Sequence, residues 1–423
     1  WDERYMFDLT GRMDGSSNFA SKQRTAPFWS VGARWNLYNE AFLKNSKTIQ
    51  NLALRANIGT TGNQNFSLSQ VRTLYRYNTS LYDGYMGAQI INLENPNLRW
   101  QVTMNRNIGL EAGLLNGLFN LDLNLYKNTT NDNLTDISIA PSLGFTSYKS
   151  NLGKVQNTGV DFTMTVTPIR KENMILSLFI NGNHNSNKLL EISSALSEYN
   201  QRVIDQQNSD ANNYASVGAV KAFLFEEGNS LNTIYGVKSL GIDPATGYEI
   251  FVKKNGEKTF VWDAADQVPI GVNEPLMRGF MGVNFVYKNW NLNLNMGYSF
   301  GGEQYNYTLA ERIESSDYTS NADRRALYNR WGQPGDIADY KAFGLNSKVN
   351  PSSRFIEKEN YLNLSSARIT YNFPSKLLKG VDLSMLKLSL STSELFYIST
   401  IRQERGLSYP YARRFYFSVQ LNF

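Results

Sequence analysis

Residues 291–301, with the sequence NLNLNMGYSFG, decide the fold class of this 423-residue chain. The even-numbered positions from Leu292 to Phe300 are apolar or aromatic, and the odd-numbered ones are Asn, Gly or Ser. Because successive side chains of a β-strand point to opposite faces, this alternation predicts a strand with one apolar and one polar face.

About twelve segments of the chain share this two-residue period. They lie near 4–12, 26–37, 49–60, 99–113, 118–130, 157–168, 174–187, 279–288, 290–302, 361–373, 383–398 and 412–423. Strands of soluble sheets average roughly five or six residues, whereas a tilted membrane-crossing strand needs roughly 9–11. Since most of these segments have ten or more residues, their length favours a transmembrane barrel.

The connections between these segments alternate between short and long. Short ones lie near 114–117, 169–173, 289 and 374–382, with a somewhat longer one at 38–48, and long ones lie near 61–98, 131–156, 188–278 and 303–360. Outer-membrane barrels have short periplasmic turns and long extracellular loops. The sequence therefore predicts an all-β fold, a transmembrane antiparallel β-barrel whose last residue, Phe423, lies at the periplasmic rim.

Aromatic residues are expected at the two rims of such a barrel. The predicted periplasmic group is Trp35, Tyr287, Trp290 and Phe373, and the predicted outer group is Trp100, Tyr298 and Phe300.

The composition excludes several classes of function. The chain has no cysteine and one histidine, His184, so thiolate metal sites, iron–sulfur clusters, cysteine nucleophiles and histidine-rich metal centres are excluded. A net charge of +5, without long basic runs, is too dilute to indicate nucleic-acid binding. There is no run of 18 apolar residues, which excludes a membrane-spanning helix. We expect no metal and no other cofactor.

Eight motifs, in order, resemble the C-terminal barrel half of the SusC/RagA family of TonB-dependent outer-membrane transporters of Bacteroidota. They are RMDGSSNF (12–19), FWSVGARWN (28–36), LRANIGTTGNQ (54–64), NLGKVQNTGVD (151–161), GIDPATG (241–247), RWGQPGD (330–336), YLNLSSARITYNFP (361–374) and YPYARR (409–414). One departure is Asp161, where the family usually has glutamate.

The resemblance implies that residues 1–423 are the C-terminal part of a barrel of about 22 strands. It implies import of oligosaccharides or peptides beneath a SusD-like surface lipoprotein, without enzymatic chemistry. TonB would act through an N-terminal region, with the plug and the early strands, that this chain lacks. Other implied partners are the barrel-assembly machinery and outer-membrane lipid, and a dimer of transporter–lipoprotein pairs is compatible with the resemblance.

Two groups of residues are candidates for function. Aromatic side chains stack on sugars and peptides alike, so Tyr305, Tyr307 and Trp331 in the long loops are predicted ligand contacts. Phe417, Val419, Leu421 and Phe423 resemble the aromatic-ended signal that the barrel-assembly machinery recognises.

Three further motifs are interpreted structurally. The stretch 59–64 lacks the lysine of a phosphate-binding loop, and 243–247 lacks calcium-loop spacing, so we interpret both as turns. His184 has no marked nucleophile beside it and is interpreted as a polar rim residue.

Two other classes of protein stay open. The twelve strands could close by themselves into an outer-membrane pore, or into a hydrolase that uses His184. A soluble, glycan-binding β-protein would require a second sheet over the apolar strand faces.

Overall fold

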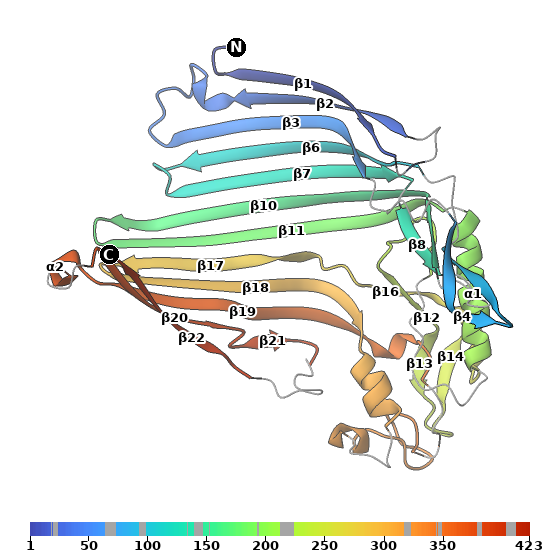
Figure 1. Cartoon of the computed structure of the whole chain (residues 1–423). Helices are drawn as coiled ribbons and strands as arrows, with labels where there is room; N and C mark the ends of the chain where they lie inside the picture. The colour runs from blue at the N-terminus through green and yellow to red at the C-terminus, as the bar shows by residue number, and fades with distance from the viewer. Residues whose placement is uncertain are drawn as a thin grey trace.

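The computed structural model describes residues 1–17, 19, 24–63, 73–92, 99–132, 134–138, 147–151, 153–192, 194–211, 224–316, 323–343, 345, 349–378, 383–402 and 412–423. Most of the long strands lie side by side in one curved antiparallel wall (Figure 1). The wall strands, in spatial order, are β1 (Tyr5–Gly15), β2 (Thr25–Asn36), β3 (Ile49–Asn63), β6 (Gln101–Leu114), β7 (Phe119–Asn131), β10 (Gly153–Lys171), β11 (Met174–Ile192), β17 (Met277–Tyr287), β18 (Trp290–Tyr305), β19 (Ile356–Asn372), β20 (Met385–Ser393) and β22 (Phe415–Asn422). The short β21 (Tyr397–Ser399) also pairs with β19. These strands match the twelve predicted segments, so the predicted all-β, antiparallel barrel wall is confirmed.

The wall has two edges. β1 is paired with β2 and β22 with β20, and these two strands stand at opposite ends of the strand order. Closure would require β1 and β22 to pair with each other. The self-closed twelve-stranded barrel, considered from the sequence, is therefore not the arrangement that the structure shows.

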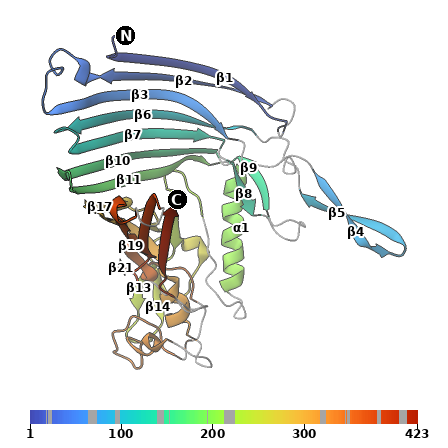
Figure 2. The same ribbon diagram turned by 60° about the vertical axis from the view of Figure 1, so that its left-hand side comes forward.

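Register separates the apolar and polar residues onto two faces of the wall. Leu54 of β3 is opposite Leu110 of β6, which is opposite Leu123 of β7. The apolar face is open: Phe7 is 73 % exposed and Phe417 is 67 % exposed. Among the described residues no second sheet lies on this face, so the soluble alternative lacks the cover that it requires (Figures 1 and 2).

The long connections, predicted only as loops, contain structure of their own. They hold β4 (Leu74–Tyr82), β5 (Tyr85–Asn92), β8 (Leu134–Ser138), β9 (Ser147–Asn151), α1 (Ser194–Ala211), β12 (Thr233–Gly236), β13 (Lys238–Ile242), β14 (Glu249–Val252), β15 (Lys258–Thr259), β16 (Val268–Val272) and the short helices η5 (Ala264–Asp266), η6 (Thr308–Glu314), η7 (Arg324–Leu327) and η8 (Ser353–Phe355). The β4–β5 hairpin projects away from the wall in Figure 2. The opposite, short connections include η2 (Leu37–Asn39) and α2 (Ser375–Leu378). In the part of the chain that the structure describes, no helix is both long and apolar enough to cross a membrane.

Helix α1 packs against the loop end of the wall. Leu196 is 2 % exposed and lies in a small core with Val155 of β10 and Leu189 of β11. Farther along the helix, the Gln267 side-chain amide donates to the side-chain oxygen Oε1 of Gln207, and both side chains are buried. The helix is therefore anchored at both of its halves.

The predicted aromatic rims are found in part. Trp35, Tyr287 and Trp290 are 38 %, 44 % and 48 % exposed, and the Trp290 ring packs on Tyr371 with centroids 4.7 Å apart. Trp100 is different, because it is 8 % exposed and packs in a core with Phe19 and Phe28. Its assignment to the outer rim was wrong.

Candidate functional site: the inner wall and the loop cluster

Four charged side chains, one from each of four neighbouring strands, lie close together on the polar face of the wall. The Arg34 guanidinium on β2 donates to both oxygens of Glu111 on β6, at 2.9 and 2.6 Å. Arg55 on β3 donates to Glu111 at 2.9 Å and to Asp122 on β7 at 2.6 Å. Two cations and two anions thus neutralise one another, and the two-point Arg34 contact fixes their geometry.

Asparagines continue the polar face toward the loops. The Asn107 amide donates to Asn57 at 2.7 Å, and the Asn185 and Asn187 amides donate to Asn157 at 3.2 and 2.9 Å. The phenol of Tyr126 donates to Asn185 at 3.0 Å. Because an amide side chain has two donors and a two-lone-pair acceptor, each asparagine can bond to its neighbour and still offer groups to a solute.

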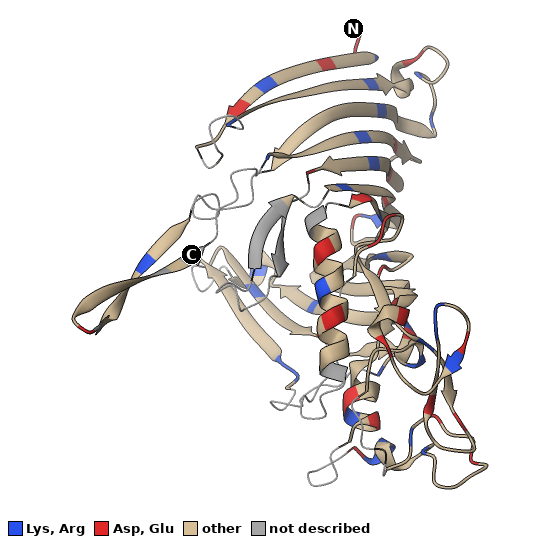
Figure 3. Ribbon diagram, turned by 90° about the vertical axis from the view of Figure 1, so that its right-hand side faces the viewer, with Lys and Arg blue, Asp and Glu red and all other residues tan. Residues whose placement is uncertain are grey.

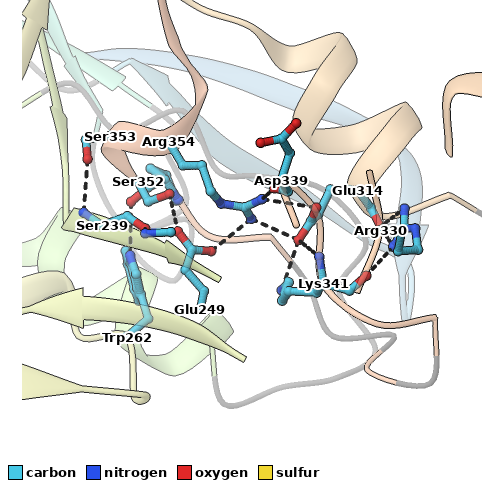
Figure 4. Close-up of polar contacts among 12 residues, drawn as sticks. Ser239, Glu249, Trp262, Glu314, Arg330, Asp339, Lys341, Ser352, Ser353 and Arg354 are labelled. Atoms are coloured by element: carbon cyan, nitrogen blue, oxygen red, sulfur yellow. Dashed lines mark hydrogen bonds and ion pairs between the residues drawn. The ribbon is translucent and has the colours of Figure 1, made fainter. Parts of the chain in front are cut away.

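A buried ion cluster joins two of the long loops (Figure 4). Arg354 of η8 donates to Glu249 of β14 at 3.0 Å and to Glu314 of η6 at 2.8 Å. The side chains are 10 %, 4 % and 1 % exposed, in that order. Burial lowers the pKa of Arg354, but the two carboxylates outweigh burial and raise the pKa above its ordinary value. Arg354 therefore stays charged, and its two ion pairs hold the loops together.

Two further cations complete the loop cluster. Burial lowers the pKa of Lys341, and Glu314, 3.9 Å from its ammonium group, opposes that effect. Arg330 donates to the carbonyl oxygens of Ala326 and Lys341, both at 2.8 Å. Its guanidinium carbon lies 4.5 Å from the centre of the Phe343 ring. Arg330 thus provides hydrogen-bond donors for main-chain carbonyl groups of its own loop.

The motifs GIDPATG and RWGQPGD, almost 90 residues apart, form one unit. The Asp243 carboxylate accepts hydrogen bonds from the Ala245 main-chain N–H at 3.2 Å and the Thr246 hydroxyl at 2.6 Å. The Trp331 indole N–H donates to the Pro244 carbonyl at 2.9 Å. The Trp331 ring also lies on Gly247, whose φ of +77° favours glycine. The interpretation of 243–247 as a turn is confirmed, and its aspartate is engaged within that turn. The turn predicted for 59–64 was wrong, because residues 59–63 continue strand β3 in register with β6.

The structure brings Tyr305 and Tyr307 together, with ring centroids 4.8 Å apart, and places Trp331 elsewhere in the loops. Tyr305 is 4 % exposed and packs against Phe355, with centroids 5.8 Å apart. In this arrangement Tyr305 forms part of the loop core, while Tyr307 and Trp331 are half-buried. Ligand contact by these three aromatics stays a prediction.

A family model described as TonB dependent receptor-like, beta-barrel, matches residues 1–234, which is more than half of the chain. The chain belongs to this family of TonB-dependent receptor-like β-barrels.

Two curated relatives show how much of such a receptor the chain represents. TonB-dependent receptor P26 of Formosa agariphila is 29 % identical over 397 residues, which cover 88 % of this chain and 38 % of the relative. TonB-dependent receptor SusC of Bacteroides thetaiotaomicron is 25 % identical over 382 residues, which cover 88 % of this chain and 36 % of SusC. The chain thus spans about two fifths of the length of these receptors, and neither name is that of an enzyme.

Solved structures of RagAB share the fold. The RagAB peptide importer in its closed-closed state matches with a TM-score of 0.82 and 23 % identity, over 100 % of this chain and 46 % of the matched chain. The structure of the RagAB peptide transporter matches with a TM-score of 0.80 and 24 % identity, over 95 % and 43 %.

The last strand of this receptor barrel places its apolar residues outward. Phe417 is opposite Leu390, Val419 opposite Leu388 and Leu421 opposite Leu386, all on the apolar face. Phe423 follows the strand and is 91 % exposed. This geometry presents the predicted assembly signal on an accessible edge, and its recognition stays a prediction.

His184 lies on the apolar, outward face of β11, opposite Val160. Its Nδ1 is 2.7 Å from the carbonyl oxygen of Leu276, so Nδ1 carries the proton and donates. Among the described residues no group of three or more His, Asp or Glu side chains is placed to hold a metal ion.

Proposed function

We propose that the protein is a TonB-dependent outer-membrane importer of the SusC type, to which this chain contributes twelve strands of the barrel wall. The observation that carries the proposal is the division of one open wall into an apolar outer face and a hydrogen-bonding inner face. That division suits a wall between membrane hydrocarbon and an aqueous lumen.

The two edges support a larger barrel. Unpaired N–H and C=O groups cannot be satisfied in hydrocarbon, so β1 and β22 require further strands. We expect the rest of the full-length protein to supply those strands, a plug in the lumen and the segment that contacts TonB. The membrane would be the outer membrane of a member of the Bacteroidota, the group suggested by the relatives from Formosa and Bacteroides.

An oligosaccharide or a peptide is the proposed cargo. The inner wall offers amide and hydroxyl groups, and four of its charges neutralise one another in one cluster, which suits polar solutes of either kind. The similarity to RagAB, which is named as a peptide importer, favours a peptide as the cargo. Tyr307 and Trp331 are the proposed aromatic contacts, and Tyr305 would position Tyr307 from beneath.

The proposed partners follow from the same model of the whole protein. A SusD-like lipoprotein would cover the loop end, and two such transporter–lipoprotein pairs could associate. The barrel-assembly machinery would insert the barrel after recognising Phe417, Val419, Leu421 and Phe423. Figure 3 shows that charged residues are sparse on the wall and frequent on the loops and α1, where a protein partner would dock.

The proposal is tested by uptake in the native bacterium. Cells with and without the full-length gene, and with and without functional TonB, are given fluorescent peptides and oligosaccharides. Uptake of one class should fall to background on loss of either gene. Uptake that continues without TonB would identify a passive pore and contradict the proposal.

A second measurement examines the partner. The tagged full-length protein, extracted in mild detergent, should co-purify with a surface lipoprotein in near-stoichiometric amount. Repeated isolation of the barrel alone from cells that express the lipoprotein would count against the SusD-like lid.

A further inference from the structure

Two rows of outward side chains cross the wall near its loop end. Cross-strand register aligns the upper row, which consists of Val31, Ile58, Arg106, Lys127, Thr158 and Ser186. The row beneath it is nearer the periplasmic end and consists of Ala33, Ala56, Ile108, Leu125, Val160 and His184. The lower row is almost entirely apolar, and the upper row introduces two adjacent cations.

These two rows line a hollow of about 750 Å³ on the outer face. Ala33 and Ala56 contribute small side chains to its lining, while Ile108 and Leu125, 60 % and 47 % exposed, contribute large apolar ones. The residues between the rows turn their side chains to the lumen, so their backbone is the floor. The hollow has the size of a small-molecule site and an apolar lining.

Arg106 and Lys127 stand directly opposite each other on β6 and β7. Like charges in this position repel and destabilise a sheet. None of the described lining residues is acidic. The nearby carboxylates Glu111 and Asp122 lie on the opposite face, where Arg34 and Arg55 neutralise them. An anion from outside the chain would relieve this repulsion.

The height of the cationic pair fits a lipid headgroup. Lys127 is eight residues beyond Phe119, the periplasmic end of β7. A strand tilted by about 45° climbs about 2.4 Å per residue, so Lys127 lies about 19 Å above that end. Because the apolar band of such barrels is about 25 Å tall, this position is in its outer part, where headgroups begin.

We propose that this hollow binds a phosphorylated, multiply acylated lipid of the outer leaflet. Its phosphate contacts Arg106 and Lys127, and an acyl chain lies along Ile108, Leu125 and Val160. The inference rests on placing the wall in the outer membrane, as the proposed function does. It adds a specific lipid site on the face that does not contact the cargo.

The test uses full-length protein in detergent micelles and native mass spectrometry. The probes are lipid A with its phosphates, the same lipid after dephosphorylation, and inorganic phosphate. Each basic residue near an anionic surface is worth about fivefold in binding. The double variant Arg106→Gln/Lys127→Gln should therefore retain about 30-fold less lipid A, and dephosphorylation should cause a similar loss.

Two further variants make the test specific. Lys154→Gln removes an outward lysine already paired with Glu191 at 3.5 Å, and should leave lipid retention unchanged. Ala56→Trp fills the hollow without altering its charge, and should reduce retention. Gel mobility with and without heating confirms that each variant is a folded barrel.

The opposite results would overturn the inference. In the first, the double variant retains as much lipid A as the native protein. In the second, the native protein retains the dephosphorylated lipid as well as lipid A. In the third, Lys154→Gln loses as much lipid A as the double variant does. Displacement of the lipid by millimolar inorganic phosphate would indicate a free-anion site instead. Normal TonB-dependent uptake alongside any of these results would leave the proposed function standing, whereas loss of uptake and membrane localisation would remove both.

Discussion

Replacement of Arg354 by methionine tests whether the buried ion cluster holds the extracellular loops together. The guanidinium is the shared partner of Glu249 and Glu314, which are 4 % and 1 % exposed. Methionine keeps much of the side-chain volume but removes the charge. Two buried carboxylates would then face each other without their cation.

The size of the effect follows from the contacts that remain. Removal of one partner from a buried ion pair costs about 3–5 kcal/mol. The Ser352 hydroxyl still donates to Glu249 at 2.7 Å, and Lys341 stays 3.9 Å from Glu314. We therefore expect the lower end, about 3 kcal/mol, which raises the open fraction of the loops about 150-fold.

Hydrogen exchange of the full-length protein measures this opening. Peptides from β14 and η6 should lose about 150-fold in protection, while the wall strands should be unchanged. Lys253→Met is the matched control, because its partner Glu257 is 64 % exposed and solvent screens such a pair. The reasoning is refuted if Arg354→Met exposes these peptides no more than Lys253→Met does.

Three other outcomes are expected. Gly247→Ala should destabilise its loop by about 2 kcal/mol or more, since alanine disfavours a φ of +77° and its Cβ would lie 2.6 Å from the Trp331 ring. Tryptophan fluorescence and loop proteolysis measure this. The Arg325 side chain and N–H lower the pKa of Asp323 from 3.8 to about 2. Its contribution to the η7 cap is therefore complete above about pH 4 and lost as pH falls through 2, whereas Asp323→Asn should show no such pH dependence in amide exchange at η7. Removal of Phe423 should lower the amount of folded barrel in outer-membrane fractions, measured by heat-dependent gel mobility.

The wall was predictable because its signal is local. In each strand, apolar and polar side chains alternate every two residues, so residues 291–301 alone specify which side chains share a face. The pairing register follows, because a shift by one residue would turn the apolar side chains away from lipid. The long loops lack that constraint. Helix α1 nevertheless carries Leu196, Tyr199 and Val203 at helical spacing, a pattern that a search for 3.6-residue periods could have found.

The loop cluster could not be predicted in the same way. Arg354 is 105 residues from Glu249 and 40 from Glu314, and nothing in the sequence near any of them indicates the pairing. Tyr305 shows the same limit, since an aromatic residue that packs in a loop core and one that stacks on a ligand are identical in sequence. The prediction of Trp100 at the outer rim was wrong for the same reason, because Trp100 packs with Phe19 and Phe28 in a small core.

The asparagines of the inner wall have a physical reason. A lumen needs polar side chains, but unpaired charges facing one another across a narrow sheet would repel. Asparagines such as Asn57 and Asn107 avoid that repulsion by bonding to each other, and the charges of the Arg34–Glu111–Arg55–Asp122 cluster cancel. Such amide groups would recognise the proposed polar cargo by hydrogen bonding. Arg106 and Lys127 lie instead on the outer face, in a hollow with no acidic residue among its described lining, so under the proposed lipid site they would serve the membrane and not the cargo.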